Sequence, residues 1–255
     1  MAEVRGERTG AIGMLIIDNP LRRNAMTADM YGAVRVAVEK LLTEEIRVVI
    51  LRGAGDVAFG AGSDISEFPT RRMDDQAERF DAIEHDAWAA LAEIPVPVIA
   101  AIHGPCMGGG IAMALHCDIR IAADDAIFAA PPARLGLAYP ADALSRLVDL
   151  VGPAQAKLLL YSARVIDAEQ ALQIGLVQEV VPKAELDAHI EKLAGQIARL
   201  APLSHRATKL SVDFLTRNDL ADDAAEARRA CYTSADYREG VQAFLDKRHA
   251  VFEGR

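Results

Sequence analysis

The sequence predicts an α/β core followed by a helical C-terminal region. Short apolar runs alternate with amphipathic, helix-like segments in the first half of the chain, as in repeated strand–helix–strand units. From about Ala141 onward, helical patterns dominate. Two glycine-rich loops each follow an apolar run and lead into a helical segment. Together these features indicate parallel strand pairing in the core.

The predicted strands are short apolar runs that end at residues unsuited to a strand. Ile12–Asp18 is almost wholly apolar and is ended by the turn dipeptide Asn19-Pro20. Gly53 ends the next run in the same way. The five strands predicted for the core are Ile12–Asp18, Arg47–Arg52, Pro97–Ile102, Asp118–Ala122 and Ala126–Ala129.

The predicted core helices show apolar positions every three or four residues. Thr27 is a suitable cap for a helix that runs to about Leu42, with Asp29 in its first turn. A second, long helix carries apolar residues at helical spacing from Met73 to Ile94. A short helix of small residues, Ile111–His116, follows the second glycine-rich loop.

The last part of the chain is predicted to be helical, with one strand at Leu176–Val181. We interpret residues 1–200 as the core and residues 201–255 as a helical oligomerisation region, because isolated helices of this length need a packed face. The predicted helices are Asp142–Val151, Pro153–Tyr161, Asp167–Ile174, Ala184–Leu200, Leu203–Arg217 and Ala221–His249.

Composition excludes several classes of protein. The 255 residues are 51% hydrophobic and 25% charged, which is ordinary for a globular chain and argues against disorder. A net charge of −9 without a basic block disfavours a nucleic-acid partner. Three widely separated cysteines fit neither a disulfide framework nor a zinc site, and the histidines show no metal spacing. With no apolar run long enough for a membrane span and no visible signal peptide, we expect a cytoplasmic protein.

The two glycine-rich loops, Gly53–Gly62 and His103–Gly110, are the main candidates for chemistry. No lysine follows either loop as a phosphate-binding P-loop requires, and the third glycine of a dinucleotide fingerprint is displaced. Two such loops are able to supply one N–H group each to an oxyanion hole. The alternative, that these glycines only form tight turns, stays open on the residues alone.

Motifs in and around both loops resemble the crotonase, or enoyl-CoA hydratase/isomerase, superfamily. Phe59-Gly60-Ala61-Gly62-Ser63-Asp64-Ile65 is similar to the family motif Phe-x-Ala-Gly-x-Asp-Ile/Leu. Pro97–Gly104 followed by Gly108–Gly110 resembles the second motif. Weaker similarities at Asn19–Met26, Asp167–Val181 and Arg238–Arg248 extend the resemblance over nearly the whole chain.

The resemblance implies a spiral core of ββα units with a C-terminal helical trimerisation region, assembled as a homotrimer or homohexamer. It implies an acyl-CoA substrate, with coenzyme A as part of the substrate and no tightly bound cofactor. No membrane partner is expected, because no apolar run is long enough for a membrane span. The N–H groups of Ala61 and Gly109 are then expected to hold the thioester oxygen while enolate charge develops on it. The expected substrate-binding residues are Arg22, Asn24, Ala61, Gly62, Ser63, Asp64, Ile65, Gly109, Phe244 and Lys247.

The chain departs from the hydratase pattern at both catalytic glutamates. Ala112 and Pro132 stand at those positions, and neither side chain exchanges a proton, so efficient hydration is not expected. Tyr139 and Asp142 are the polar candidates nearby, although Tyr139 is equally suited to the pocket wall and Asp142 to a helix cap.

Three functions are therefore open. The first is an acyl-CoA lyase or isomerase that stabilises a thioester enolate. The second is decarboxylation, because Phe128, Pro132, Leu135-Gly136 and Tyr139 resemble methylmalonyl-CoA decarboxylase, although Ser63 and Pro131 differ from it. The third is a non-catalytic acyl-CoA-binding protein that has kept the hole and lost the acids.

Overall fold

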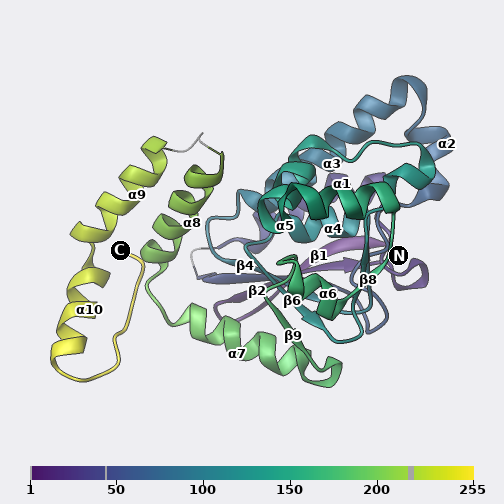
Figure 1. Ribbon diagram of the computed structural model, residues 1–255. Helices are drawn as coiled ribbons and strands as arrows, with labels where there is room; N and C mark the ends of the chain where they lie inside the picture. The colour runs from purple at the N-terminus through teal and green to yellow at the C-terminus, as the bar shows by residue number, and fades with distance from the viewer. Residues whose placement is uncertain (1, 44, 218–220) are drawn as a thin grey trace.

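Two β-sheets form the centre of the protein (Figure 1), seen in a computed structural model that describes residues 2–43, 45–217 and 221–255. The larger sheet has the strand order β1-β2-β3-β4-β6-β9, and the smaller has the order β5-β7-β8. The strands are β1 Glu3–Thr9, β2 Ile12–Asp18, β3 Val48–Gly53, β4 Val98–Ile102, β5 Pro105–Met107, β6 Ile119–Ala123, β7 Ile127–Ala129, β8 Ile166–Asp167 and β9 Glu179–Val181.

Strands β2, β3, β4, β6 and β9 pair in parallel, which confirms the predicted parallel pairing for the first four core strands. The fifth predicted core strand lies in the smaller sheet as β7, parallel to β5 and antiparallel to β8. Strand β1, which pairs antiparallel with β2 at the edge of the sheet, was not predicted. Only Val4 of this strand is buried, so β1 lacks the apolar run by which the other strands were recognised.

Helices cover both faces of the larger sheet. Val49 and Leu51 of β3 point to one face and join a core with α1, whereas Val48 and Ile50 point to the other and pack with α7. The helices are α1 Ala28–Leu41, α2 Phe68–Arg71, α3 Ala77–Ala92, α4 Gly109–Leu115, α5 Ala141–Ser162, α6 Ala168–Gln173, α7 Leu186–Ala198, α8 Pro202–Arg217, α9 Ala221–Thr233 and α10 Ala235–Leu245.

The C-terminal helices differ in one respect from the prediction. The predicted helix Ala221–His249 is wrong, because it is divided into α9 and α10 at Ser234. The Ser234 side chain accepts a hydrogen bond from the Tyr237 N–H and so caps a new helix. The two predicted helices on either side of Gly152 are present within α5, where Gly152 has a positive φ of 74°.

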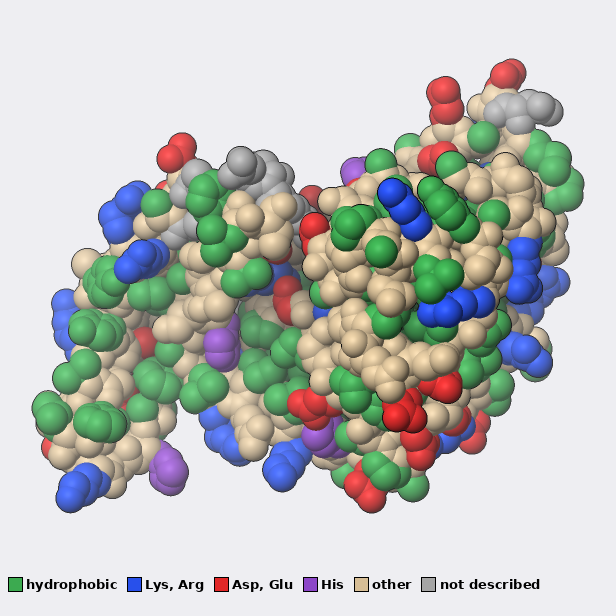
Figure 2. Space-filling model, in the orientation of Figure 1, with side chains coloured by type: hydrophobic (Ala, Val, Ile, Leu, Met, Phe, Trp, Pro, Cys, Tyr) green, Lys and Arg blue, Asp and Glu red, His purple; other side chains and the backbone are tan. Residues whose placement is uncertain are grey.

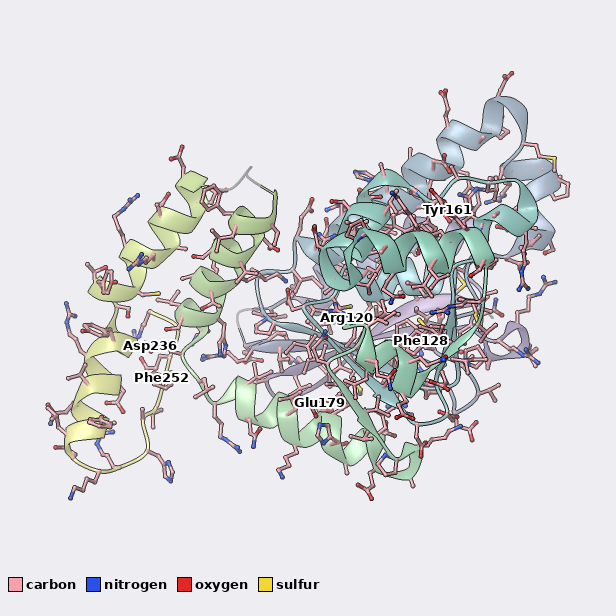
Figure 3. All side chains as sticks on the ribbon, viewed as in Figure 1. Arg120, Phe128, Tyr161, Glu179, Asp236 and Phe252 are labelled. Carbon is pink, nitrogen blue, oxygen red and sulfur yellow. The ribbon has the colours of Figure 1, made fainter. Side chains whose placement is uncertain are left out.

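Helices α8, α9 and α10 project from one side of the core as an arm, and the chain end folds back onto that arm (Figure 1). Asp236 accepts hydrogen bonds from the N–H groups of Glu253 and Gly254, at 2.7 and 2.9 Å. Figure 3 shows Asp236 and Phe252 together at this position. The last residues therefore stabilise the arm rather than extend away from it.

The structure also bears on the expectations for the cysteines and for membrane spans. Cys106, Cys117 and Cys231 are free thiols. Within the described ranges, no helix has both the length and the apolar character that a membrane span requires.

Candidate active site

The two glycine-rich loops lie backbone against backbone. The Gly60 N–H donates to the Pro105 carbonyl at 3.1 Å, and the Met107 N–H donates to the Gly60 carbonyl at 2.9 Å. A Cβ atom on Gly110 would lie 2.5 Å from the Gly60 oxygen, which leaves no room for a side chain. The close approach fixes the two loops relative to each other.

A small cavity of about 110 Å³ opens between these loops. Pockets that hold a drug-sized ligand measure ~300–1,000 Å³, so this cavity suits one part of a larger ligand, such as an acyl group. Loop residues, α3 and the segment before α5 form its wall: Ala61, Gly62, Ser63, Ile65, Phe68, Arg72, Glu84, Trp88, Met107, Gly108, Gly109, Ala112, Pro131, Pro132, Leu135, Leu137, Ala138, Tyr139 and Pro140.

The backbone N–H groups of Ser63 and Gly109 lie at this cavity without an acceptor among the described residues. A Cβ on Gly109 would lie 3.4 Å from the Ser63 nitrogen, so the two residues are close. Ala61, which the resemblance assigns to the hole, instead donates its N–H to the Arg23 carbonyl at 2.9 Å. The assignment of the oxyanion donor to Ala61 is therefore wrong, and the available N–H belongs to Ser63.

A buried carboxylate on the cavity wall was missed by the sequence analysis. Glu84 of α3 is 2% exposed and accepts a 2.6 Å hydrogen bond from the Ser63 hydroxyl. Arg72 donates to both carboxylate oxygens, at 3.2 and 2.8 Å. The sequence does contain an indication that Glu84 is buried. It lies four residues after Phe80 and three before Ala87, on the apolar side of its helix.

Aromatic rings enclose the Arg72 guanidinium. It lies over the rings of Phe68 and Phe80, at 5.0 and 4.6 Å from their centroids. Burial raises the pKa of the Glu84 carboxyl above its ordinary value, while the charge of Arg72 and the hydrogen bond from Ser63 act in the opposite direction. The cavity therefore contains one carboxyl group with a perturbed protonation equilibrium.

The two positions at which hydratases of the family have glutamates lie at the cavity, as the resemblance implies. Ala112 and Pro132 both line the cavity and present apolar surface to it. Tyr139 also lines the cavity, and its hydroxyl donates a 3.0 Å hydrogen bond to the Gly108 carbonyl. Burial raises the pKa of the Tyr139 phenol well above its ordinary value.

Asp142 is engaged elsewhere and does not line the cavity, contrary to its predicted catalytic position. Its carboxylate lies 2.9 Å from Nδ1 of His85 and 3.7 Å from Nε2 of His116. It also accepts the Ala143 N–H at 2.8 Å, in the first turn of α5. Although burial acts to raise the pKa of Asp142, the hydrogen bonds from His116 and Ala143 hold it below its ordinary value.

Two of the expected substrate-binding side chains have structural partners instead. Asn24 is buried, and its amide group donates to the carbonyls of Ala54 and Ala58, so its side chain is engaged within the fold. Asp64 accepts two 2.9 Å hydrogen bonds from Arg22. The Arg22 side chain is still 55% exposed, so its guanidinium remains accessible.

The remaining expected residues fall into two groups. Ala61, Gly62, Ser63, Ile65 and Gly109 all line the cavity. Phe244, within α10, and Lys247, two residues after it, are exposed and belong to the arm, which contributes no residue to the cavity wall. No group of three or more His, Cys, Asp or Glu side chains in the described part of the chain is placed to hold a metal ion.

Comparison with known proteins extends over nearly the full length. The model of the enoyl-CoA hydratase/isomerase family matches residues 7–255. Crotonyl-CoA hydratase of Syntrophomonas wolfei is 36% identical over 251 residues, covering 96% of both chains. Short-chain-enoyl-CoA hydratase of Clostridium acetobutylicum is 33% identical over 246 residues, covering 95% of this chain and 94% of its own.

Solved structures agree with the sequence relatives. An enoyl-CoA hydratase/carnithine racemase from Magnetospirillum magneticum superimposes with a TM-score of 0.95 at 35% identity, covering 100% of this chain and 97% of its own. Enoyl-CoA hydratase from Bacillus anthracis gives a TM-score of 0.89 at 30% identity, covering 99% and 100%. The predicted crotonase-like fold with C-terminal helices is confirmed.

Proposed function

Because the chain belongs to the enoyl-CoA hydratase/isomerase family, we propose that it binds short acyl-CoA thioesters and transforms them through an enolate. The observation that carries this proposal is a pair of N–H groups at one small cavity, those of Ser63 and Gly109, with no acceptor among the residues that the structure describes. A thioester oxygen between them accepts two hydrogen bonds that strengthen as negative charge develops. Each donor of this kind contributes about 3–4 kcal/mol to the transition state.

The names of two relatives, crotonyl-CoA hydratase and short-chain-enoyl-CoA hydratase, suggest an acyl chain of about this size for the present protein. The small cavity volume supports that choice. Coenzyme A enters as part of the substrate, and Arg22 is an exposed cation beside the first loop. No tightly bound cofactor is required for enolate formation.

Slow hydration follows from the residues at the cavity wall. A hydratase activates water and protonates carbon with positioned acids and bases, each worth about 10²–10⁴-fold in rate. Ala112 and Pro132 offer neither function. We therefore expect crotonyl-CoA to be hydrated poorly, although it binds.

Decarboxylation is the second candidate, favoured by the apolar Ala112 and Pro132 together with Tyr139 at the cavity. Loss of CO₂ from a malonyl-type thioester leaves both bonding electrons on C2 and forms the enolate directly. That reaction needs the oxyanion hole and a proton donor but no base. The third candidate, a non-catalytic binder, predicts affinity without turnover.

Measurements of binding and of turnover distinguish these three candidate functions. Calorimetry with acetyl-CoA tests the site itself, and absence of binding at millimolar ligand overturns the proposal. Initial rates with crotonyl-CoA and methylmalonyl-CoA are then compared on the same preparation. Hydration of crotonyl-CoA with kcat at or above ~10³ s⁻¹, the upper end of the usual range, refutes the expectation of slow hydration.

A further inference from the structure

Glu84 is the carboxyl group that remains at a cavity whose two expected glutamates are absent. It enters from α3, whereas Ala112 belongs to α4 and Pro132 to the segment before α5. Its side chain is 2% exposed. A carboxyl group buried in this way has a desolvation cost, and such groups with a perturbed protonation equilibrium cluster at functional sites.

The contacts of Glu84 connect it with the proposed oxyanion hole. Its Oε1 atom accepts the 2.6 Å hydrogen bond from Ser63 Oγ, and the backbone N–H of Ser63 belongs to the proposed hole. A Cβ on Gly109 would lie 3.1 Å from Ser63 Oγ. The hydroxyl therefore lies between the carboxyl group and the place where a thioester would sit.

Other groups around Glu84 fix the position of its side chain and influence its protonation. Arg72, which precedes α3, binds both carboxylate oxygens, and Tyr31 of α1 lies 3.2 Å from Ser63 Oγ. Among the described residues, Asp81 on the same helix and the phenol groups of Tyr31 and Tyr139 also interact electrostatically with Glu84. Arg72 favours the carboxylate, whereas burial and Asp81 favour the neutral acid.

We propose that Glu84 exchanges a proton with C2 of the bound acyl group through the hydroxyl of Ser63. To form the enolate, Ser63 Oγ takes a proton from C2 as its own proton passes to Glu84, and the C–H electron pair moves toward the thioester oxygen. To protonate an enolate, both transfers run in reverse and Glu84 ends as the carboxylate bound to Arg72. No other reactant is needed.

This inference rests on the proposed function, and its test is proton exchange rather than net reaction. Wild-type protein is incubated with acetyl-CoA in deuterium oxide, and deuterium at C2 is measured by mass spectrometry. We expect exchange that rises with pH as Glu84 ionises, because the carboxylate is the form that receives the proton. The inflection should lie above the ordinary glutamate value, since burial raises this pKa.

Two substitutions separate the proton path from the oxyanion hole. Ser63→Ala removes the hydroxyl and keeps the backbone N–H, and Glu84→Gln keeps the shape of the side chain without its acid–base function. Each should slow exchange by about 100-fold or more and abolish the pH inflection, while acetyl-CoA still binds in calorimetry. Glu78→Gln, an exposed position on the same helix, is the matched control and should exchange like wild type.

The outcomes are distinguishable. Absence of acetyl-CoA binding by wild type overturns the proposed function, and this inference with it. Binding without exchange, or exchange by Ser63→Ala at the wild-type rate and with the wild-type pH profile, overturns the inference alone. If Glu84→Gln fails to fold, as judged by circular dichroism, Ser63→Ala decides the question because it removes a single oxygen atom.

Discussion

The hydroxyl of Tyr139 donates a 3.0 Å hydrogen bond to the carbonyl of Gly108, the residue that precedes the second N–H donor of the site. The phenolic proton is thus hydrogen-bonded to the backbone of the second glycine-rich loop. Burial raises the pKa of Tyr139 well above its ordinary value. Both facts favour a positioning role for Tyr139 over proton transfer to the substrate.

Tyr139→Phe should therefore reduce activity only modestly. An intramolecular hydrogen bond contributes about 0.5–1.5 kcal/mol, which corresponds to a loss of roughly 2- to 12-fold. Steady-state kinetics with the best substrate measures the change in kcat/KM. A loss of 100-fold or more with unchanged binding would contradict this role and restore Tyr139 as the proton donor.

Features of the structure that depend on residues close together in the sequence were predicted correctly. The bounds of β2 are predicted correctly because a local apolar run and its Asn19-Pro20 ending define them. The N-cap at Thr27 is also local, since its side chain accepts the Met30 N–H only three residues away. Both glycine-rich loops are found for the same reason.

The errors in predicting the site residues arise from contacts between segments that are distant in the sequence. Ala61 loses its predicted role because its N–H reaches the Arg23 carbonyl, and Arg23 has a positive φ of 52° that no local pattern predicts. Glu84 was missed because Ser63 and Arg72, at other positions in the chain, make its burial possible. Side-chain chemistry at the site is decided by tertiary pairing.

Gly109→Ala should disable the site while a matched substitution leaves it intact. The added Cβ would lie 2.2 Å from the Tyr31 hydroxyl and 3.1 Å from Ser63 Oγ, so the second loop or these two side chains must shift. Because loss of one oxyanion donor costs about 10²–10³-fold in kcat, we expect a decrease of that order in the C2 exchange rate.

Gly195→Ala is the control for this experiment. Gly195 lies within α7 and a Cβ there meets no atom within 4 Å. Alanine in place of glycine within a helix adds about 0.5–1 kcal/mol of stability. Wild-type exchange by the Gly109→Ala protein, measured by mass spectrometry beside the control, would be incompatible with the proposed hole.

Asn24→Ala should destabilise the fold. The buried amide side chain accepts the Asn19 N–H at 2.9 Å and donates to the carbonyls of Ala54 and Ala58, at 3.0 and 2.7 Å. Each buried group left without a partner costs about 1–3 kcal/mol, so the free energy of unfolding should fall by at least about 2 kcal/mol.

Urea unfolding at neutral pH measures this change, and Gln173→Ala on the surface of α6 serves as the control. Asn24 also has a positive φ of 57°, a conformation that asparagine tolerates better than alanine. A loss below about 0.5 kcal/mol, the usual scale of surface substitutions, would show that these hydrogen bonds do not support the first loop.

His103 should make stability depend on pH. It is buried, and burial followed by the charges of Arg52 and Lys183 lowers its pKa below the ordinary value. The unfolded chain then binds a proton near pH 6.5 that the folded protein does not bind, so stability is lost as pH falls below that value. Between pH 7.5 and 5.5 this residue should contribute a loss of up to about 1.4 kcal/mol.

Urea unfolding of wild type and His103→Gln at both pH values isolates that contribution. Other buried groups, His116 included, titrate in both proteins and cancel in the difference. The variant should show the smaller decrease in unfolding free energy. An equal decrease in the two proteins would mean that folded His103 takes up a proton as readily as the unfolded chain.

The C-terminal arm should hold the protein in a trimer or hexamer. Many large apolar side chains of the arm are exposed in the single chain, and Figure 2 shows apolar side chains over α8, α9 and α10. Clustered exposed apolar surface marks interaction sites. These side chains include Val212, Leu215, Tyr232, Tyr237, Val241, Phe244 and Leu245.

Light scattering should give three or six times the chain mass of 27.4 kDa. Leu215 is 79% exposed, and Leu215→Glu should shift the population toward smaller species because association would bury a charge. Val57→Glu, at an exposed apolar position of the first glycine-rich loop, is the control and should leave the mass unchanged. A wild-type monomer of 27.4 kDa at micromolar concentration would contradict assembly through the arm.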